Sequence, residues 1–309
     1  MAAASAPGKL ILFGEHAVVF GEPALSTAID LRTEVYARPH SEWLADGSSL
    51  ENDKYRYVRR ATEMSWSGSP LWLEIRSMIP LGCGLGSSAA VTVATLGALA
   101  ALRGETLQRD AIARRAFDVE HSVQGRASPI DTSTATHGSG ILLLKERRDG
   151  FLWEIAKDER RWFIHHCDLP EIHYVVGNTG IVAATGPLVA GVKARVESNP
   201  TAADAVREIG KIALEGLKAL QARDFVEAGA LMDRNHALLN LLGVGHPMLE
   251  KLVAAARPHA FGAKLTGAGG GGSMFALTEE PERVRTAIEA VGGRAFVVET
   301  DPRGAEVLR

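Results

Sequence analysis

The stretch over residues 80–90 carries residue types that could bind a phosphate chain. Three alternating glycines precede two serines, and a run of good helix formers then covers residues 89–102. Because glycine lacks a Cβ, the backbone can curl with its N–H groups pointing inward. The first turn of a helix adds unpaired N–H groups and partial positive charge. This pattern favours an anion site; the alternative is a tight strand-to-helix turn capped by a serine.

Two carboxylates and a lysine could complete a site for phosphoryl transfer. The helix expected over residues 108–124 presents Glu120 on its apolar face, where a carboxylate needs a partner. That partner is either an arginine or lysine, or a metal ion. Asp131 follows in a loop, where it either caps a turn or helix or acts as an acid or base. Lys9 offers a cation at the start of an apolar run.

Gly14, Glu15 and His16 interrupt that apolar run. We expect residues 10–13 and 17–20 to form short buried strands on either side of them. Charges inside an apolar run are costly unless they point into a polar site. Glu15 and His16 therefore either line such a site or lie in a solvent-exposed hairpin turn, and the residue pattern leaves both open.

A second glycine-rich segment, residues 267–272, satisfies the spacing G-x-G-x-x-G. That spacing indicates a dinucleotide site only when it follows a strand and opens a helix. Here residues 273–277 have the pattern of a strand, so a close backbone approach to a ligand or to another loop fits better. The Walker pattern G-x-x-x-x-G-K-[S/T] does not occur in the sequence.

Phosphoryl transfer needs an anion cradle, a divalent metal, a group that orients or deprotonates the attacking hydroxyl, and a cation. Mg²⁺ prefers one or two protein oxygens together with phosphates and water. The chain offers a candidate for each role: residues 82–88, Ser88 with Glu120, Asp131, and Lys9. Spacing alone does not show that these residues converge.

Strands and helices must position these residues in both halves of the chain. Residues 71–79 alternate apolar and polar side chains with the period of a strand and lead into the first glycine stretch. In the second half we expect a strand at residues 173–177 and four helices between residues 187 and 256. Strands then flank residues 267–272, and a helix and a last strand follow. The charged residues 157–161 mark a crossing between two domains.

The composition is that of an ordinary globular chain and limits the classes of partner. A length of 309 residues suits two domains, and a net charge of −3 gives no reason to expect a nucleic-acid surface. Cys83 and Cys167 form no C-x-x-C pair, so neither a disulfide framework nor a zinc site is expected. We find no signal-peptide pattern and no apolar run of the roughly 20 residues that span a bilayer. We therefore expect a cytoplasmic protein without nucleic-acid or membrane partners.

Three stretches resemble the signature motifs of the GHMP kinases and, within them, of the mevalonate kinases. They cover residues 7–21, 80–90 and 264–272, in the family's order and at its usual separations. The run Glu-His-Ala-Val-Val at residues 15–19 favours the mevalonate kinases over the galactokinases. Residues 123–132 resemble the short archaeal and bacterial form.

This resemblance implies a role for each candidate. Asp131 would act as base toward the acceptor hydroxyl, with Lys9 beside it to lower the pKa of that hydroxyl. Ser88 and Glu120 would hold Mg²⁺, which favours the metal over the ion pair as the partner of Glu120. The residues implied to bind the ATP phosphates are Pro80, Gly82, Gly84, Leu85, Gly86, Ser87, Ser88 and Ala89. Those implied to contact mevalonate are Glu15, His16, Thr185 and Gly269.

The implied fold is α+β with the two-domain architecture of the GHMP kinases. An N-terminal α/β ATP-binding domain would cover residues 1–165 and a ferredoxin-like C-terminal domain residues 166–309, with the active site between them. The implied activity is transfer of the ATP γ-phosphate to the 5-hydroxyl of mevalonate in isoprenoid synthesis, by a homodimer. The alternatives are another GHMP small-molecule kinase, acting on phosphomevalonate, homoserine or a sugar, and a non-catalytic nucleotide sensor.

Pro129 departs from the pattern of many relatives, which have glycine at this position. Proline fixes φ near −65° and removes an N–H donor. The loop that carries Asp131 must therefore be held without that donor.

Overall fold

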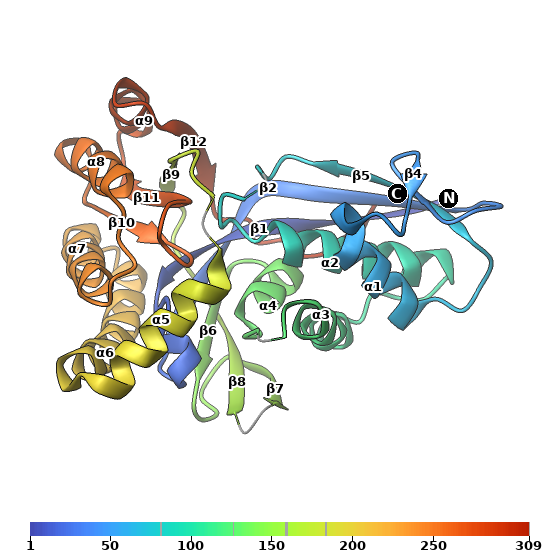
Figure 1. Ribbon diagram of the computed structural model, residues 1–309, viewed down its shortest axis with the longest axis horizontal. Coiled ribbons are helices and arrows are strands. Elements are labelled where there is room, and N and C mark those ends of the chain that lie inside the picture. The colour runs from blue at the N-terminus through green and yellow to red at the C-terminus, as the bar shows by residue number, and fades with distance from the viewer. Residues whose placement is uncertain (81, 126, 158–159, 183, 309) are drawn as a thin grey trace.

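The computed structural model describes residues 1–80, 82–125, 127–157, 160–182 and 184–308, and it contains two β-sheets with helices packed on each (Figure 1). The long strands β1 and β2 extend along the molecule, away from the second sheet at one end (Figure 1). The mixed α and β content expected from the sequence is confirmed, and each half of the chain contributes a sheet.

The first sheet is built around β2, which pairs with β1 along one edge and with β5 and β6 along the other. Its order is β4-β3-β5-β2-β6-β8-β7, with β1 also pairing with β13. The strands are β1 (Ala2–Phe13), β2 (Ala24–Pro39), β3 (Leu44–Ala45), β4 (Ser48–Ser49), β5 (Leu71–Ser77), β6 (Gly140–Leu144), β7 (Phe151–Lys157), β8 (Arg160–Cys167) and β13 (Glu306–Leu308). The helices of this part are α1 (Arg56–Ser65), α2 (Ser87–Leu102), α3 (Arg109–Gln124) and α4 (Ile130–His137). Helix α2 packs on β1 and β2, with α1, α3 and α4 beside it.

The second sheet is fully antiparallel, in the order β10-β11-β9-β12. This is the ferredoxin-like order that the resemblance implies, with the first and third strands in the middle. Its elements are β9 (His173–Asn178), α5 (Thr185–Ser198), α6 (Pro200–Gln221), α7 (Phe225–Leu241), α8 (Pro247–Ala256), β10 (Gly262–Thr266), β11 (Ser273–Thr278), α9 (Pro281–Ala290) and β12 (Arg294–Glu299). Short 3₁₀ turns lie at Ala17–Phe20, Asp53–Tyr55 and Arg257–His259.

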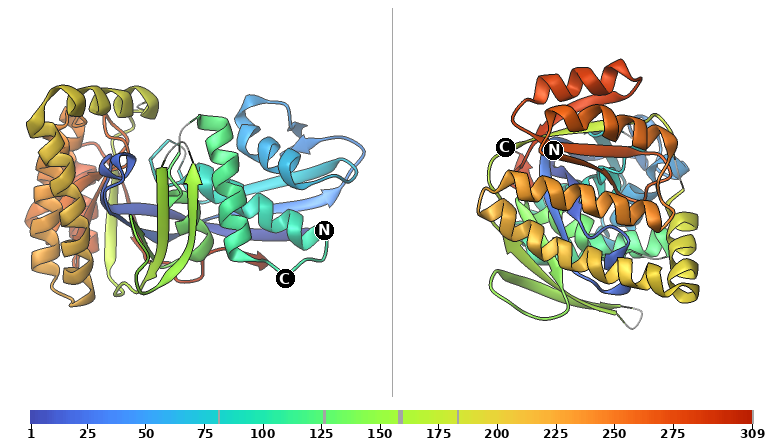
Figure 2. Two further views of the ribbon diagram at one scale, coloured as in Figure 1. Left: turned by 90° about the horizontal axis from the view of Figure 1, so that it is seen from below. Right: turned by 90° about the vertical axis from the view of Figure 1, so that its left-hand side faces the viewer.

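The two parts share one apolar core and are joined at both ends of the chain. Leu10 and Phe13 of β1 lie in one buried cluster with Ile212 of α6 and Phe275 of β11. After β12 the chain returns to the first sheet, where β13 pairs with the start of β1, so the two termini lie side by side (Figure 2). β8 spans the boundary expected between residues 165 and 166; the boundary itself stays a prediction. None of the helices in the described part of the chain is both long and apolar enough to cross a membrane.

Two local expectations for the N-terminus were wrong. Residues 17–20 form a 3₁₀ turn and not a strand, because Ala17 N–H and Val18 N–H bond back to the carbonyls of Glu15 and Gly14. The preceding strand is also longer than expected: it begins at Ala2 and is buried almost throughout.

Candidate active site

The candidate base and the candidate cation form an ion pair. Lys9 Nζ lies 3.2 Å from Asp131 Oδ1. Lys9 is 3% exposed in the middle of β1, and Asp131 lies in the first turn of α4. Opposite charges at this distance attract each other. Asp131 therefore pairs with Lys9 rather than capping its helix, since no side chain caps α4.

The first glycine stretch curls tightly around the backbone of β1. Gly82, Gly84 and Gly86 all have φ between +72° and +76°, which residues with a Cβ rarely adopt. Gly86 also has no room for a side chain, because a Cβ there would lie 2.7 Å from Lys9 Cγ. Lys9 N–H donates to Leu85 O at 2.9 Å. The loop is thereby fixed to the strand that carries the cation.

Exposure alternates along this loop. Cys83 and Leu85 are buried, while Gly82 and Gly84 are exposed. The remaining residues implied to bind phosphate follow, with Pro80, Gly86, Ser87 and Ser88 half-buried and Ala89 buried. A left-handed Gly86 stands at the N-cap of α2, which begins at Ser87. The expected alternative of a serine cap is therefore wrong, and the first-turn N–H groups of α2 carry no side-chain partner from the cap.

The Ser88 hydroxyl instead donates to Glu120 Oε1 at 2.8 Å. Glu120 projects from α3 and is 2% exposed. Burial and, after it, the charge of Asp131 raise the pKa of Glu120 to about 8, while the hydrogen bond from Ser88 and the charge of Lys9 oppose this shift. The carboxylates of Glu120 and Asp131 thus repel each other, and a further cation between them would stabilise their ionised forms.

The donor set fits Mg²⁺ bound together with a nucleotide. Ser88 and Glu120 offer one hydroxyl and one carboxylate, the hard oxygen ligands that Mg²⁺ takes in small number beside phosphates and water. Within the described ranges, no cluster of three or more His, Cys, Asp or Glu side chains could hold a metal by itself. The chemistry of these donors therefore suits a metal that arrives with phosphate oxygens.

Pro129 does not disturb the helix that carries Asp131. It stands at the N-cap of α4, a position where a missing N–H costs little because the first N–H groups of a helix have no intrahelical partner. Its carbonyl accepts from Ser133 N at 3.0 Å and from Ser133 Oγ at 2.5 Å. The loop is thus held through the carbonyl of the proline.

Glu15 forms a buried ion pair with Lys264 of β10, across the two parts of the molecule. Both side chains are fully buried. Burial raises the pKa of Glu15 and lowers that of Lys264, while the charge of each partner opposes the shift. Glu15 Oε2 has no hydrogen-bond partner among the described residues. The exposed hairpin turn considered for this segment is therefore wrong.

His16 connects the first motif to the second glycine segment. It has φ +60°, and its Nε2 lies 3.0 Å from Ala268 O. Burial lowers its pKa, so the neutral ring donates through Nε2. Gly269, the residue after Ala268, packs against the backbone of Val244. A Cβ at Gly269 would lie 2.1 Å from Val244 O.

The two glycine segments face each other. A Cβ at Gly267 would lie 3.8 Å from Gly84 Cα. Thr266 Oγ1, just before Gly267, donates to Ile11 O of β1 at 3.2 Å. The second segment thus approaches the first loop closely through backbone, as the sequence pattern predicted.

Family models match both parts of this arrangement. The model for the N-terminal domain of GHMP kinases matches residues 54–139 and the model for the GHMP kinase C-terminal domain matches residues 217–297. The chain belongs to the GHMP kinase family. Its sequence is 37% identical to the mevalonate kinase of Thermococcus onnurineus, over 98% of this chain and 97% of that one.

Solved structures agree with this assignment. The Methanococcus jannaschii mevalonate kinase matches this GHMP kinase with a TM-score of 0.80 and 28% identity, over 97% of this chain and 98% of that chain. The L. major mevalonate kinase in complex with R-mevalonate matches with a TM-score of 0.82 and 26% identity, over 96% and 95% of the two chains.

Thr185 differs in exposure from the other three residues proposed to contact mevalonate, which are all buried. It is the first residue of α5, with an exposed side chain and no hydrogen-bond partner among the described residues. Two residues of the quoted motifs, Leu81 and Arg126, lie outside the described residues.

Lys264 is a site residue of this GHMP kinase to which sequence reasoning gave no role. A signal was present, because Lys264 stands between apolar residues in the same way as Glu15 and His16. A buried charge implies a partner of opposite charge. The acidic Glu15 in one apolar run and the basic Lys264 in another could therefore have been predicted to form a pair.

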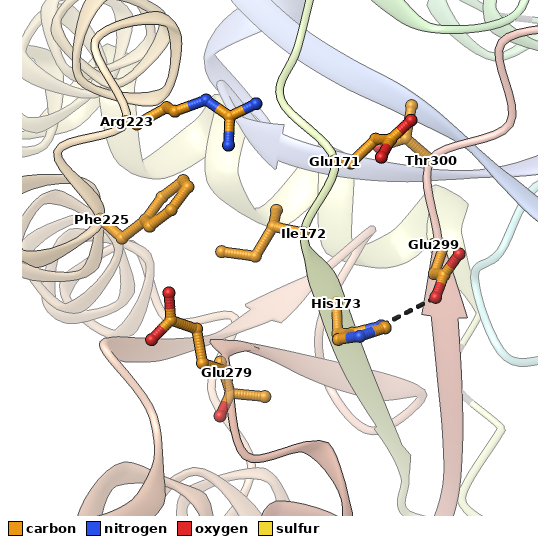
Figure 3. A pocket seen from close by; sticks show the side chains of 9 residues that line it. Glu171, Ile172, His173, Arg223, Phe225, Glu279, Glu299 and Thr300 are labelled. Carbon is orange, nitrogen blue, oxygen red and sulfur yellow. Dashed lines mark ion pairs between the residues drawn. The ribbon is translucent and has the colours of Figure 1, made fainter.

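A hollow of about 440 Å³ lies away from these residues. It opens between β9, the end of β12 and the turn from α6 to α7, and His173 pairs with Glu299 on its wall at 3.0 Å (Figure 3). Its lining contains none of the candidate site residues.

Proposed function

We propose that this GHMP kinase is a mevalonate kinase, which transfers the γ-phosphate of ATP to the 5-hydroxyl of (R)-mevalonate in isoprenoid synthesis. The observation that carries the proposal is the Lys9–Asp131 pair beside a left-handed glycine loop. A base, a cation and an anion cradle are the groups that phosphoryl transfer requires. The choice of mevalonate rests on full-length relatives of that name and on the L. major enzyme, whose structure holds R-mevalonate.

Asp131 would accept the proton of the attacking 5-hydroxyl, while Lys9 stabilises the charge that develops on the oxygen. The pair is pre-formed at 3.2 Å, so little reorganisation is needed when the substrate binds. The N–H groups of the loop at residues 82–86 and of the first turn of α2 would bind the ATP phosphates. Pro80 and Ala89 would flank that binding loop.

Ser88 and Glu120 would hold Mg²⁺. When bound, Mg²⁺ would neutralise charge on the β- and γ-phosphates. Glu120 must lose its proton to act as ligand. Its 2.8 Å hydrogen bond from Ser88 already holds the two oxygens next to each other.

We retain Glu15, His16, Thr185 and Gly269 as proposed contacts of mevalonate. Glu15 Oε2 supports this for the first of them, since it is a buried acceptor without a partner among the described residues. His16 and Gly269 would act through the backbone of the second glycine segment that they hold. The Thr185 hydroxyl has no hydrogen-bond partner among the described residues, so it could donate to or accept from a ligand.

A panel of acceptors tests the proposal. Purified protein is incubated with ATP, Mg²⁺ and either mevalonate, phosphomevalonate, homoserine or galactose, and ADP release and the phosphorylated product are measured. We expect turnover of mevalonate well above that of the others. Clear turnover of another acceptor with none of mevalonate would identify a different GHMP kinase, and ATP binding without any turnover would favour a nucleotide sensor. The homodimer and the cytoplasmic location stay predictions.

A further inference from the structure

The end of the chain reaches the helix that carries Asp131. We call residues 300–308 the C-terminal tail. It follows β12, an edge strand of the second sheet, and ends in β13. β13 pairs with Ala3, Ala4 and Ser5 of β1. Between these points the tail passes the C-terminal end of α4, as its hydrogen bonds show.

The tail supplies hydrogen bonds that the last turn of α4 cannot make internally. The last carbonyls of a helix have no intrahelical donor. Ala305 N–H donates to Thr136 O at 2.9 Å, and Ser139 N–H, just beyond the helix, donates to Asp301 O at 2.8 Å. Arg109 of α3 adds a bridge, since it donates to Arg303 O at 2.6 Å and to His137 O at 3.5 Å.

Two glycines let the tail and the helix end touch through backbone alone. Gly138 has φ +76° and Gly304 has φ +65°. A Cβ at Gly138 would lie 2.4 Å from Gly304 N, and a Cβ at Gly304 would lie 2.5 Å from Thr136 O. Neither position can accept a side chain without displacing the other segment, because both obstacles are backbone.

A buried ion pair fixes the tail to β1 and β2. Asp301 is 1% exposed and accepts from Arg32 Nη1 at 2.5 Å. Arg32 also donates to Ser5 Oγ of β1 at 2.8 Å and to Gly304 O of the tail at 2.7 Å. The same strand β1 carries Lys9. The tail therefore contacts both elements that hold the Lys9–Asp131 pair.

Helix α4 has little stability of its own. It is eight residues long and rich in threonine and serine, and a helix that short is not stable in isolation. Hydroxyls of Ser133, Thr134 and Thr136 bond to carbonyls four residues back, a pattern that slightly destabilises helices. Its position is thus set by its surroundings.

We propose that the C-terminal tail is a positioning device for catalysis: by tying the end of α4 to β1 and β2, it holds Asp131 at hydrogen-bond distance from Lys9 and from the acceptor hydroxyl. Gly304, Asp301 and Arg32 are its positioning residues. The catalytic part of this inference rests on the proposed function, while the coupling of the tail to α4 does not.

Gly304→Ala is the variant that tests it, with Gly104→Ala as the matched control. Both glycines have positive φ, but a Cβ at Gly104 would meet nothing within 4 Å. The backbone strain is therefore similar and only the contact with α4 differs. We expect Gly304→Ala to lower kcat by about tenfold or more, where kcat is normalised to the number of sites that bind ATP. Its KM values should stay within about twofold of wild type. Gly104→Ala should have kcat and KM values near those of wild type.

Arg109→Ala is a second variant that will fold, because Arg109 is exposed. Its control is Arg103→Ala, which removes another exposed arginine that donates to a backbone carbonyl. We expect a smaller fall in kcat for Arg109→Ala alone. A double-mutant cycle separates positioning from general damage: added to Asp131→Asn, Gly304→Ala should have little further effect on kcat.

Hydrogen exchange of the α4 amides gives a readout that needs no substrate. We expect faster exchange in Gly304→Ala than in Gly104→Ala. Unchanged α4 protection, an unchanged kcat, or effects of Gly304→Ala and Asp131→Asn that simply multiply would each overturn the proposal. If the wild-type protein phosphorylates no acceptor, the proposed function fails, and the exchange comparison still decides whether the tail orders α4.

Discussion

Lys9 Nζ lies 3.2 Å from Asp131 Oδ1, and the two residues come from a buried strand and a short helix far apart in the sequence. This pair joins the two chemical requirements of the proposed reaction, a proton acceptor and a cation next to the reacting oxygen. Two further parts of the site contact or act on this pair: the glycine loop is fixed to the backbone of Lys9, and the charge of Asp131 contributes to the raised pKa of Glu120.

Asp131→Asn removes the base and keeps the shape of the side chain. We expect kcat for mevalonate to fall by about 10²–10⁴-fold, with ATP affinity nearly unchanged, because the loop at residues 82–86 is intact. Steady-state kinetics and calorimetric titration with ATP measure the two quantities. Asp118→Asn, on the exposed side of α3, is the control. Near-normal turnover of Asp131→Asn would mean that Asp131 has a structural role only.

Glu120→Gln removes the carboxylate proposed as metal ligand while it keeps an acceptor for Ser88. We expect the Mg²⁺ concentration needed for half-maximal rate to rise by about 10-fold or more, since a charged ligand is lost. The rate is measured against Mg²⁺ at saturating ATP. The exposed Glu63→Gln is the control. An unchanged Mg²⁺ titration would assign Glu120 to a structural hydrogen bond.

The raised pKa of Glu120 predicts proton release on metal binding. With its pKa at about 8, Glu120 is protonated at pH 7 before Mg²⁺ and ATP bind, and it must be deprotonated to coordinate. At pH 7 the wild-type protein should release up to about one proton more than Glu120→Gln. The difference should vanish as the pH rises above the pKa, because the proton is then already lost. Titration calorimetry in buffers of different ionisation enthalpy measures it; an equal release by both proteins at pH 7 would contradict the assignment.

Lys264→Met leaves the Glu15 carboxylate buried without its partner. We expect a loss of about 3–5 kcal/mol in the free energy of unfolding, measured by denaturant titration. Adding Glu15→Gln to this variant should restore much of the loss, because the uncompensated charge is removed. Lys251→Met, at an exposed position of α8, serves as control. A Lys264→Met protein as stable as the control would show that the Glu15–Lys264 pair, which joins the two parts of the molecule, contributes nothing to the free energy of unfolding.

The residues that could be predicted from sequence are those with a local physical signature. Alternating glycines predicted the left-handed turns at Gly82, Gly84 and Gly86, and helical spacing predicted that Glu120 faces inward. The ferredoxin-like strand order followed from the resemblance and is confirmed.

Long-range contacts could not be predicted in this way. Lys9 and Asp131 meet only because β1 and α4 pack side by side, and no spacing encodes that. The same holds for Glu15 with Lys264 and for the return of the tail to α4. The sequence also allowed a serine cap for α2, but Gly86 takes the N-cap position and the Ser88 hydroxyl donates to Glu120.

A structure of the protein with (R)-mevalonate and a non-hydrolysable ATP analogue tests the central claim most directly. The account predicts the 5-hydroxyl within about 3.2 Å of an Asp131 carboxylate oxygen, with Lys9 beside it and the triphosphate on the loop at residues 82–88. A 5-hydroxyl beyond hydrogen-bond reach of Asp131, directed to another side chain or away from the γ-phosphate, would contradict it.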